Sequence, residues 1–179
     1  MHLTKRTFLP RIFAIGLSVL GLMFGPGLVS VQAQEVENLG TFRFWTAWKG
    51  ADTNGVMCYV SSQPQKAEPS NVNRDAIHFL VIHRKGLGTR NEVQTIVGYP
   101  LESNSTPKVT VDGKGFDMVV EGSAAWLASA SDESGFVAAM KAGSSMVVKG
   151  RSQRGTDTTD TYSLSGVTAA MEKIQQACS

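Results

Sequence analysis

The chain has 179 residues, a formal net charge of +2 and two cysteines. Its positive charge lies at the N-terminus, because residues 1–33 contain three of the 17 basic residues and none of the 15 acidic ones. The remaining part of about 146 residues has a net charge of about −1, and it is large enough to bury one core. This balance excludes the basic surface that is typical of nucleic-acid binding.

The first 33 residues have the pattern of a signal peptide. Basic residues precede an uncharged apolar stretch over residues 12–31, and small residues occupy the −3 and −1 positions of a cleavage site after Ala33. An uncleaved membrane anchor is the alternative, because the stretch nearly reaches spanning length. Its glycines and Pro26 disfavour a permanent helix. We therefore expect cleavage, a single domain over residues 34–179 with no membrane span, and a periplasmic, outer-membrane-surface or secreted location.

Period-two alternation predicts the first two strands. Aromatic and polar residues alternate over 41–48, which predicts one strand with aromatic side chains on both faces. Turn residues fill 49–55. Alternation over 56–60 then predicts a second strand with Cys58 pointing inward, and residues 64–75 are predicted to form a polar loop.

The middle of the chain predicts a central strand, a further strand and a hairpin. Residues 77–82 are almost all apolar, which is typical of a strand covered on both faces. The next strand is expected over 91–99, before Pro100. Asp112-Gly113 is a favoured tight-turn pair between alternating segments, so residues 108–121 predict a hairpin.

The last third of the chain predicts two strands and two helices. Strands over 146–152 and 156–164 bring the total to about eight, which indicates a mainly β domain. One short helix is expected to begin at Ser131 as its N-cap and to end at Gly143. The other is expected over 166–178. Its apolar residues recur at helical spacing along one face: Val167, Ala170, Met171, Ile174 and Cys178.

The two cysteines are predicted to form one disulfide, Cys58–Cys178. Each lies on an inward-facing stripe, and two cysteines in an oxidising compartment commonly pair. A metal site is the weaker alternative, because two thiols would need two further ligands. A bridge that closes nearly the whole domain into a loop would stabilise it by about 4–5 kcal/mol in the chain-entropy model, as an upper figure.

The sequence shows no recognisable catalytic, cofactor-binding or metal-ligating pattern. His78 and His83 are five residues apart on one predicted strand, so they face opposite sides and cannot act as a pair. No serine lies in a Gly-x-Ser-x-Gly elbow. We expect binding without catalysis, cofactor, metal or nucleic acid. A pair of carboxylates such as Glu92 and Asp160, brought together by the fold, is the remaining enzymatic alternative.

Polar residues that begin one strand and flank a later turn form a candidate cluster. Alternation directs Asp160 inward, where a lone carboxylate would need a partner. An Arg–Asp pair that fixes strand register is the favoured interpretation, and a polar ligand site is the functional alternative. The cluster comprises Arg90, Glu92, Arg154 and Asp160, with Arg151 and Asp157 beside the same turn.

The most distinctive motifs of the chain lie in its second half. They are the run from 146 to 150, then Arg154-Gly155-Thr156, then the run from 160 to 166, preceded by Arg90-Asn91-Glu92-Val93. In this order they resemble the invasion-associated locus B family of α-proteobacteria, over nearly all of residues 34–179. The resemblance implies an immunoglobulin-like β-sandwich and an association with host-cell invasion. It carries over no catalytic residue.

Three functions are considered. The leading one is an exported, non-enzymatic binding protein of the bacterial envelope that acts on a protein or another envelope component and contributes to invasion. A periplasmic housekeeping protein, such as a small chaperone or inhibitor, is the alternative, and a hydrolase with an unusual site is the third. The aromatic candidates for a binding surface are Trp45, Trp48 and Tyr99, and we expect at least one of them to be exposed beside a loop.

Overall fold

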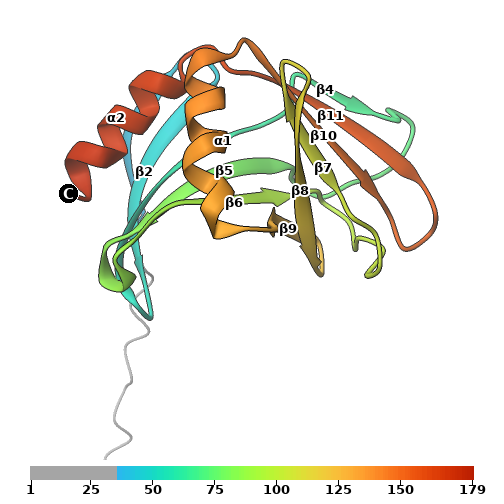
Figure 1. Cartoon of the computed structure of the whole chain (residues 1–179), viewed down its shortest axis with the longest axis horizontal. Helices are drawn as coiled ribbons and strands as arrows, with labels where there is room; N and C mark the ends of the chain where they lie inside the picture. Colours follow the sequence, from blue (N-terminus) through green and yellow to red (C-terminus); the bar gives the residue numbers. More distant parts are fainter. Residues whose placement is uncertain (1–35) are drawn as a thin grey trace, which may run out of the picture. The chain divides into compact units, whose positions relative to one another are not determined.

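A computed structural model describes residues 36–179 of the chain. The signal peptide and the cleavage after Ala33 lie outside the described residues and stay predictions. The described residues form eleven strands, two α-helices and a short 3₁₀ helix, η1 (Figure 1). Neither α-helix has the length and apolar character needed to cross a membrane.

The elements are short and follow one another closely along the chain. The strands are β1 Glu37–Phe42, β2 Trp45–Asp52, β3 Gly55–Ser62, β4 Lys66–Glu68, β5 His78–Arg84, β6 Thr89–Ile96, β7 Lys108–Val111, β8 Lys114–Glu121, β9 Ala124–Leu127, β10 Ser145–Arg151 and β11 Asp157–Ser163. The helices are η1 Lys85–Leu87, α1 Ala130–Ala142 and α2 Val167–Ala177.

All eleven strands belong to one hydrogen-bonded sheet in the order β1-β2-β3-β5-β6-β9-β8-β7-β10-β11-β4. Every pairing between neighbours is antiparallel. Strand β8 serves two halves, because its first residues pair with β7 and its last with β9. The sheet bends there, and the halves β1–β9 and β7–β4 face each other as a sandwich (Figure 1). The predicted mainly β, sandwich-like fold with two helices is confirmed.

Aromatic side chains fill the space between the two halves. The ring of Phe79 on β5 lies 5.8 Å from that of Tyr162 on β11, and 6.4 Å from Trp45 on β2. The Trp45 indole Nε1 donates to the carbonyl of Ser163, 2.9 Å away, and so links β2 to β11. These fully buried rings provide much of the apolar area that stabilises the domain.

Both helices close the inner side of the β1–β9 half. Helix α1 buries Phe136, Val137 and Met140, and Gly143 ends it as predicted. Its N-cap is Ser129, two residues before the predicted Ser131. Helix α2 packs its predicted apolar stripe against β1, β2 and β3. At its end the predicted disulfide Cys58–Cys178 is present, with the two Cα atoms 6.0 Å apart.

The prediction of a single strand over 41–48 is wrong. Phe42 pairs with Trp45 across a two-residue turn, in which Arg43 has a φ of 57°. Residues facing each other across a hairpin point to the same side of a sheet, so this turn moves the inward set from even to odd positions. The aromatic residues that alternation assigned to two faces therefore share the inner face at Phe42 and Trp45.

Other strand boundaries differ from the predictions in detail. The predicted loop over 64–75 contains the short edge strand β4, and the strand expected over 91–99 ends at Ile96. The expected count of about eight strands is too low, because the pattern does not predict β1, β4 and β9 as separate strands. The 108–121 hairpin is confirmed, with its tight turn at Asp112 and Gly113.

Candidate functional site

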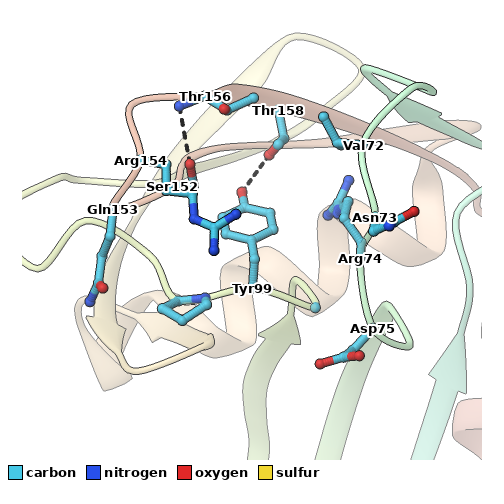
Figure 2. Close-up of a pocket in the computed structure, with 12 residues that line it drawn as sticks. Val72, Asn73, Arg74, Asp75, Tyr99, Ser152, Gln153, Arg154, Thr156 and Thr158 are labelled. Atoms are coloured by element: carbon cyan, nitrogen blue, oxygen red, sulfur yellow. Dashed lines mark hydrogen bonds between the residues drawn. The ribbon is translucent and has the colours of Figure 1, made fainter.

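A cavity of about 620 Å³ lies where three connecting segments meet (Figure 2). One segment, residues 72–75, belongs to the loop that leads into β5. The second, residues 98–100, follows β6, and the third surrounds the turn between β10 and β11. We call this cavity the Tyr99 pocket, and its lining comprises residues 72–75, 98–100, 152–154, Thr156 and Thr158.

Arg74 forms the floor of the Tyr99 pocket and belongs to a buried ion pair. Arg74 donates from Nη1 and Nη2 to the two carboxylate oxygens of Asp160, at 2.7 and 2.6 Å. Its Nε and Nη2 also donate to the carbonyl of Val97, at 2.9 and 2.8 Å. The side chains of Arg74 and Asp160 are only 6% and 1% exposed. Since Val97 follows β6 and Asp160 lies on β11, this arginine joins the two halves of the sandwich.

Tyr99 lies directly beside this ion pair. The Arg74 guanidinium carbon is 5.0 Å from the centre of the Tyr99 ring, a cation–π distance. The Tyr99 hydroxyl is 2.5 Å from Oγ1 of Thr158, which in turn donates to the carbonyl of Gly150 at 3.4 Å. Burial raises the pKa of Tyr99, so its phenol stays neutral at physiological pH. The ring is held in one position as a rigid wall.

The turn between β10 and β11 contributes a second arginine. Ser152 shapes the turn by accepting the N–H of Thr156 at its Oγ, 3.0 Å away. Arg151 forms salt bridges with the carboxylates of Glu102 and Asp157, with N–O distances of 3.3 and 3.0 Å. Arg154 is exposed and forms no salt bridge with any of the described residues. Its guanidinium extends toward the pocket in Figure 2.

The four residues of the predicted polar cluster are distributed over different contacts. Asp160 pairs with Arg74, as the interpretation of a structural Arg–Asp pair requires, but its partner is a loop residue that the sequence did not single out. Glu92 pairs with Arg84 at 3.1 Å. Arg90 donates to Gln175 of α2, 2.7 Å away. Of the four, only Arg154 lines the Tyr99 pocket.

The expectation that one of three aromatic residues would be exposed beside a loop is wrong. Trp45 is fully buried, and Trp48 and Tyr99 are half-buried. Trp48 stacks on Tyr59 with ring centres 6.3 Å apart, and its Nε1 donates to Ser61. Tyr99 nevertheless lines a cavity. The exposed fraction of the whole residue does not show this, because most of its surface is covered.

The two histidines point to opposite faces of β5, as predicted. His83 is 3% exposed, and its Nε2 lies 3.3 Å from the amide oxygen of Asn91. Its Nδ1 has no hydrogen-bond partner among the described residues. Burial lowers the pKa of His83, and the cations Arg90 and Lys141 add to the effect. Neither histidine lines the Tyr99 pocket.

The chain matches the family described as Invasion associated locus B (IalB) protein over residues 45–175. It belongs to this family. The resemblance carried by the motifs of the second half is thereby confirmed. The matched range includes all three segments of the Tyr99 pocket, so the pocket is part of the IalB domain itself.

A solved structure has the same fold. The IalB chain is similar to the crystal structure of invasion associated protein B from Bartonella henselae, with a TM-score of 0.54 and 13% sequence identity. The likeness covers 77% of this chain and 96% of the Bartonella chain. At this identity it supports the fold alone. No curated protein sequence matches the chain.

The charged and hydrogen-bonding groups of the Tyr99 pocket are suited to binding a polar ligand. It combines a rigid aromatic wall, a neutralised arginine in its floor and a cation without an internal counter-ion. No group of three His, Cys, Asp or Glu side chains that could hold a metal ion occurs among residues 36–179. A cavity of this size, with a few fixed polar groups, is typical of sites that bind small molecules or short segments of a partner.

Proposed function

We propose that this IalB-family protein is an exported, non-enzymatic binding protein of the bacterial envelope, and that the Tyr99 pocket is its binding site. One observation carries the proposal: a cavity of about 620 Å³ with a floor fixed by the Arg74–Asp160 pair. A preformed site loses little conformational entropy when a ligand binds, which favours affinity.

The side chains around the Tyr99 pocket support binding more than catalysis. General acid–base chemistry needs a group whose pKa lies near the working pH and that can reach the substrate. The phenol of Tyr99 has a raised pKa, Arg74 is held by Asp160, and His83 does not line the pocket. Glu92 and Asp160, the carboxylates considered for a hydrolase, each bind an arginine of their own.

The family description supports a contribution to invasion, because it names the family for that association. A binding protein at the envelope would contribute by contacting a protein or another surface component. The Tyr99 pocket is placed in connecting segments, which is where scaffolds commonly carry their recognition residues. A housekeeping chaperone or inhibitor would use the same pocket on a periplasmic partner.

The proposal is tested by filling the pocket. Asn73 is exposed and lines the cavity, so Asn73→Trp places a large ring there without disturbing the core. Asn104→Trp is the matched control, because Asn104 is equally exposed and does not line the cavity. The purified protein and both variants are immobilised, and the envelope components that each retains are quantified by mass spectrometry.

We expect Asn73→Trp to reduce retention of a specific component about tenfold or more, which corresponds to a loss of at least about 1.4 kcal/mol. Asn104→Trp should retain it like the unaltered protein. Equal retention by all three proteins would contradict the assignment of the site. Turnover of an envelope component by the purified protein, lost in Asn73→Trp, would contradict the non-enzymatic part.

A further inference from the structure

Two side chains of opposite charge line the Tyr99 pocket and form no salt bridge within residues 36–179. They are Arg154 and Asp75, both of them exposed. Arg74 also lines the pocket, but its charge is neutralised by the buried carboxylate of Asp160. The field that a ligand meets in the pocket is therefore set by Arg154 and Asp75.

Backbone hydrogen bonds attach the two segments that carry these charges to the residues on either side of Tyr99. The N–H of Asp75 donates to the carbonyl of Gly98, 2.9 Å away. The N–H of Gln153, next to Arg154, donates to the carbonyl of Pro100 at 3.0 Å. Gly98 precedes Tyr99 in the chain and Pro100 follows it. The segment that carries Asp75 is therefore bound to the residue before Tyr99, and the segment that carries Arg154 to the residue after it. Figure 2 shows Arg154 and Asp75 on different sides of the ring.

The pocket also offers hydrogen-bonding groups that have no partner inside the described part of the chain. These groups are the side-chain amides of Asn73 and Gln153 and the hydroxyl of Thr156, and all three residues line the cavity. None of the three groups forms a hydrogen bond with another described residue. Amide and hydroxyl groups both donate and accept, so they match the N–H and C=O groups of a peptide backbone.

We infer that the Tyr99 pocket binds a short peptide segment of mixed charge, with an acidic group at Arg154 and a basic group at Asp75. This inference rests on the proposed function and specifies its ligand. Asp75 would repel a purely anionic ligand, and Arg154 would repel a purely cationic one. An apolar ligand would remove both charges from water without compensation, which is costly. A cavity of about 620 Å³ has room for about three residues.

The test is a ¹H–¹⁵N NMR titration of the purified protein with three tripeptides blocked at both ends. The first has the sequence Glu-Gly-Lys. In the second Gln replaces Glu, and in the third Gln replaces Lys, so each control lacks one charge. We expect the first peptide to shift the resonances of residues 72–75, 98–100 and 152–156, and each control to bind about two- to fivefold more weakly, as for exposed ion pairs.

Two isosteric variants assign each charge to its partner. In Arg154→Gln, the peptides that contain Glu and Gln at the first position should bind equally, while the preference for Lys remains. In Asp75→Asn the reverse should hold. This is the logic of a double-mutant cycle, and a loss of fold would not reproduce it, because misfolding weakens all three peptides alike.

The outcomes separate this inference from the proposed function. Equal binding of the three peptides to the unaltered protein, with pocket resonances shifted, would overturn the mixed-charge inference and leave the binding function standing. The same holds if no peptide binds while retention of an envelope component still depends on Asn73→Trp. If neither the peptides nor the envelope component responds to changes in the pocket, both proposals fail.

Discussion

Two buried cross-links join distant parts of this chain, and they differ in kind. The disulfide Cys58–Cys178 spans 120 positions and ties the end of α2 to β3. The ion pair Arg74–Asp160 spans 86 positions and ties a loop to β11. A disulfide stabilises mainly by restricting the unfolded chain. A buried ion pair acts in the folded state, where its attraction must offset the desolvation of both charges.

The two cross-links also differ in their position relative to the proposed binding site. Both cysteines belong to the hydrophobic core, and neither lines the Tyr99 pocket. The ion pair includes Arg74, which lines the Tyr99 pocket, and it holds the loop over residues 72–75 in place. The disulfide holds the sandwich together, and the ion pair also shapes the pocket that we propose as the binding site.

Removing the disulfide should have the largest effect on stability. Cys178→Ser together with Cys58→Ser should lower the free energy of unfolding by up to about 5 kcal/mol, because the loop that it closes is nearly the whole domain. Thermal unfolding followed by circular dichroism measures the loss. The expected fall in Tm is about 10–15 °C for a domain of this size. Two titratable thiols in the native, non-reduced protein would contradict the bridge.

Breaking the ion pair should cost about 3 kcal/mol or slightly more, because Arg74→Met leaves the carboxylate of Asp160 buried without its partner. Urea unfolding measures the change. The exposed pair Lys108–Asp117 provides the control, and Lys108→Met should cost less than about 1 kcal/mol. Replacing both partners, with Arg74→Met and Asp160→Leu, should recover part of the loss. An equal loss of unfolding free energy in Arg74→Met and Lys108→Met would contradict the expectation that the buried pair contributes more than the exposed one.

Acidification should weaken the region around the disulfide through His83, the neighbour of Cys58 across β3 and β5. The pKa of His83 is lowered in the folded protein from its usual 6.5, so below pH 6.5 the unfolded chain binds more protons than the folded one. Stability should therefore fall as the pH drops from 6.5 toward the folded-state pKa. His83→Gln should flatten this dependence in urea unfolding at a series of pH values. An unchanged pH dependence in His83→Gln would show that His83 is not its source.

Deleting one hydroxyl at the pocket should have the smallest effect. Tyr99→Phe removes the hydrogen bond to Thr158, at 2.5 Å, but keeps the ring beside Arg74. We expect a loss of about 1 kcal/mol, or about 2–4 °C in Tm. Tyr59→Phe is the matched control, since the Tyr59 hydroxyl makes no hydrogen bond with the described residues. A smaller loss in Tyr99→Phe than in Tyr59→Phe would show that the hydroxyl does not fix the wall of the pocket.

Features that depend on local periodicity are predictable from the amino-acid sequence. The apolar stripe of α2 directed Cys178 toward the sheet, and alternation in β3 directed Cys58 inward, so the disulfide was predictable from two stripes. The hairpin at Asp112-Gly113 and the central strand β5 followed from turn chemistry and from an unbroken apolar run. For the two stripes, a repeat of two or 3.6 residues assigns a face to every side chain.

The contacts between polar groups, in contrast, depend on how distant segments pack together. Alternation directed Asp160 inward, but its partner Arg74 lies in a loop without periodicity, which carries no information about the direction of a side chain. The same is true of Asp75 and of Tyr99, whose positions depend on hydrogen bonds to segments far away in the chain. At Arg43 a two-residue turn shifts the inward-facing residues from even to odd positions, and the alternation of residue types does not predict this shift. Periodicity specifies the face that a residue occupies, whereas the residue opposite it depends on how the segments pack.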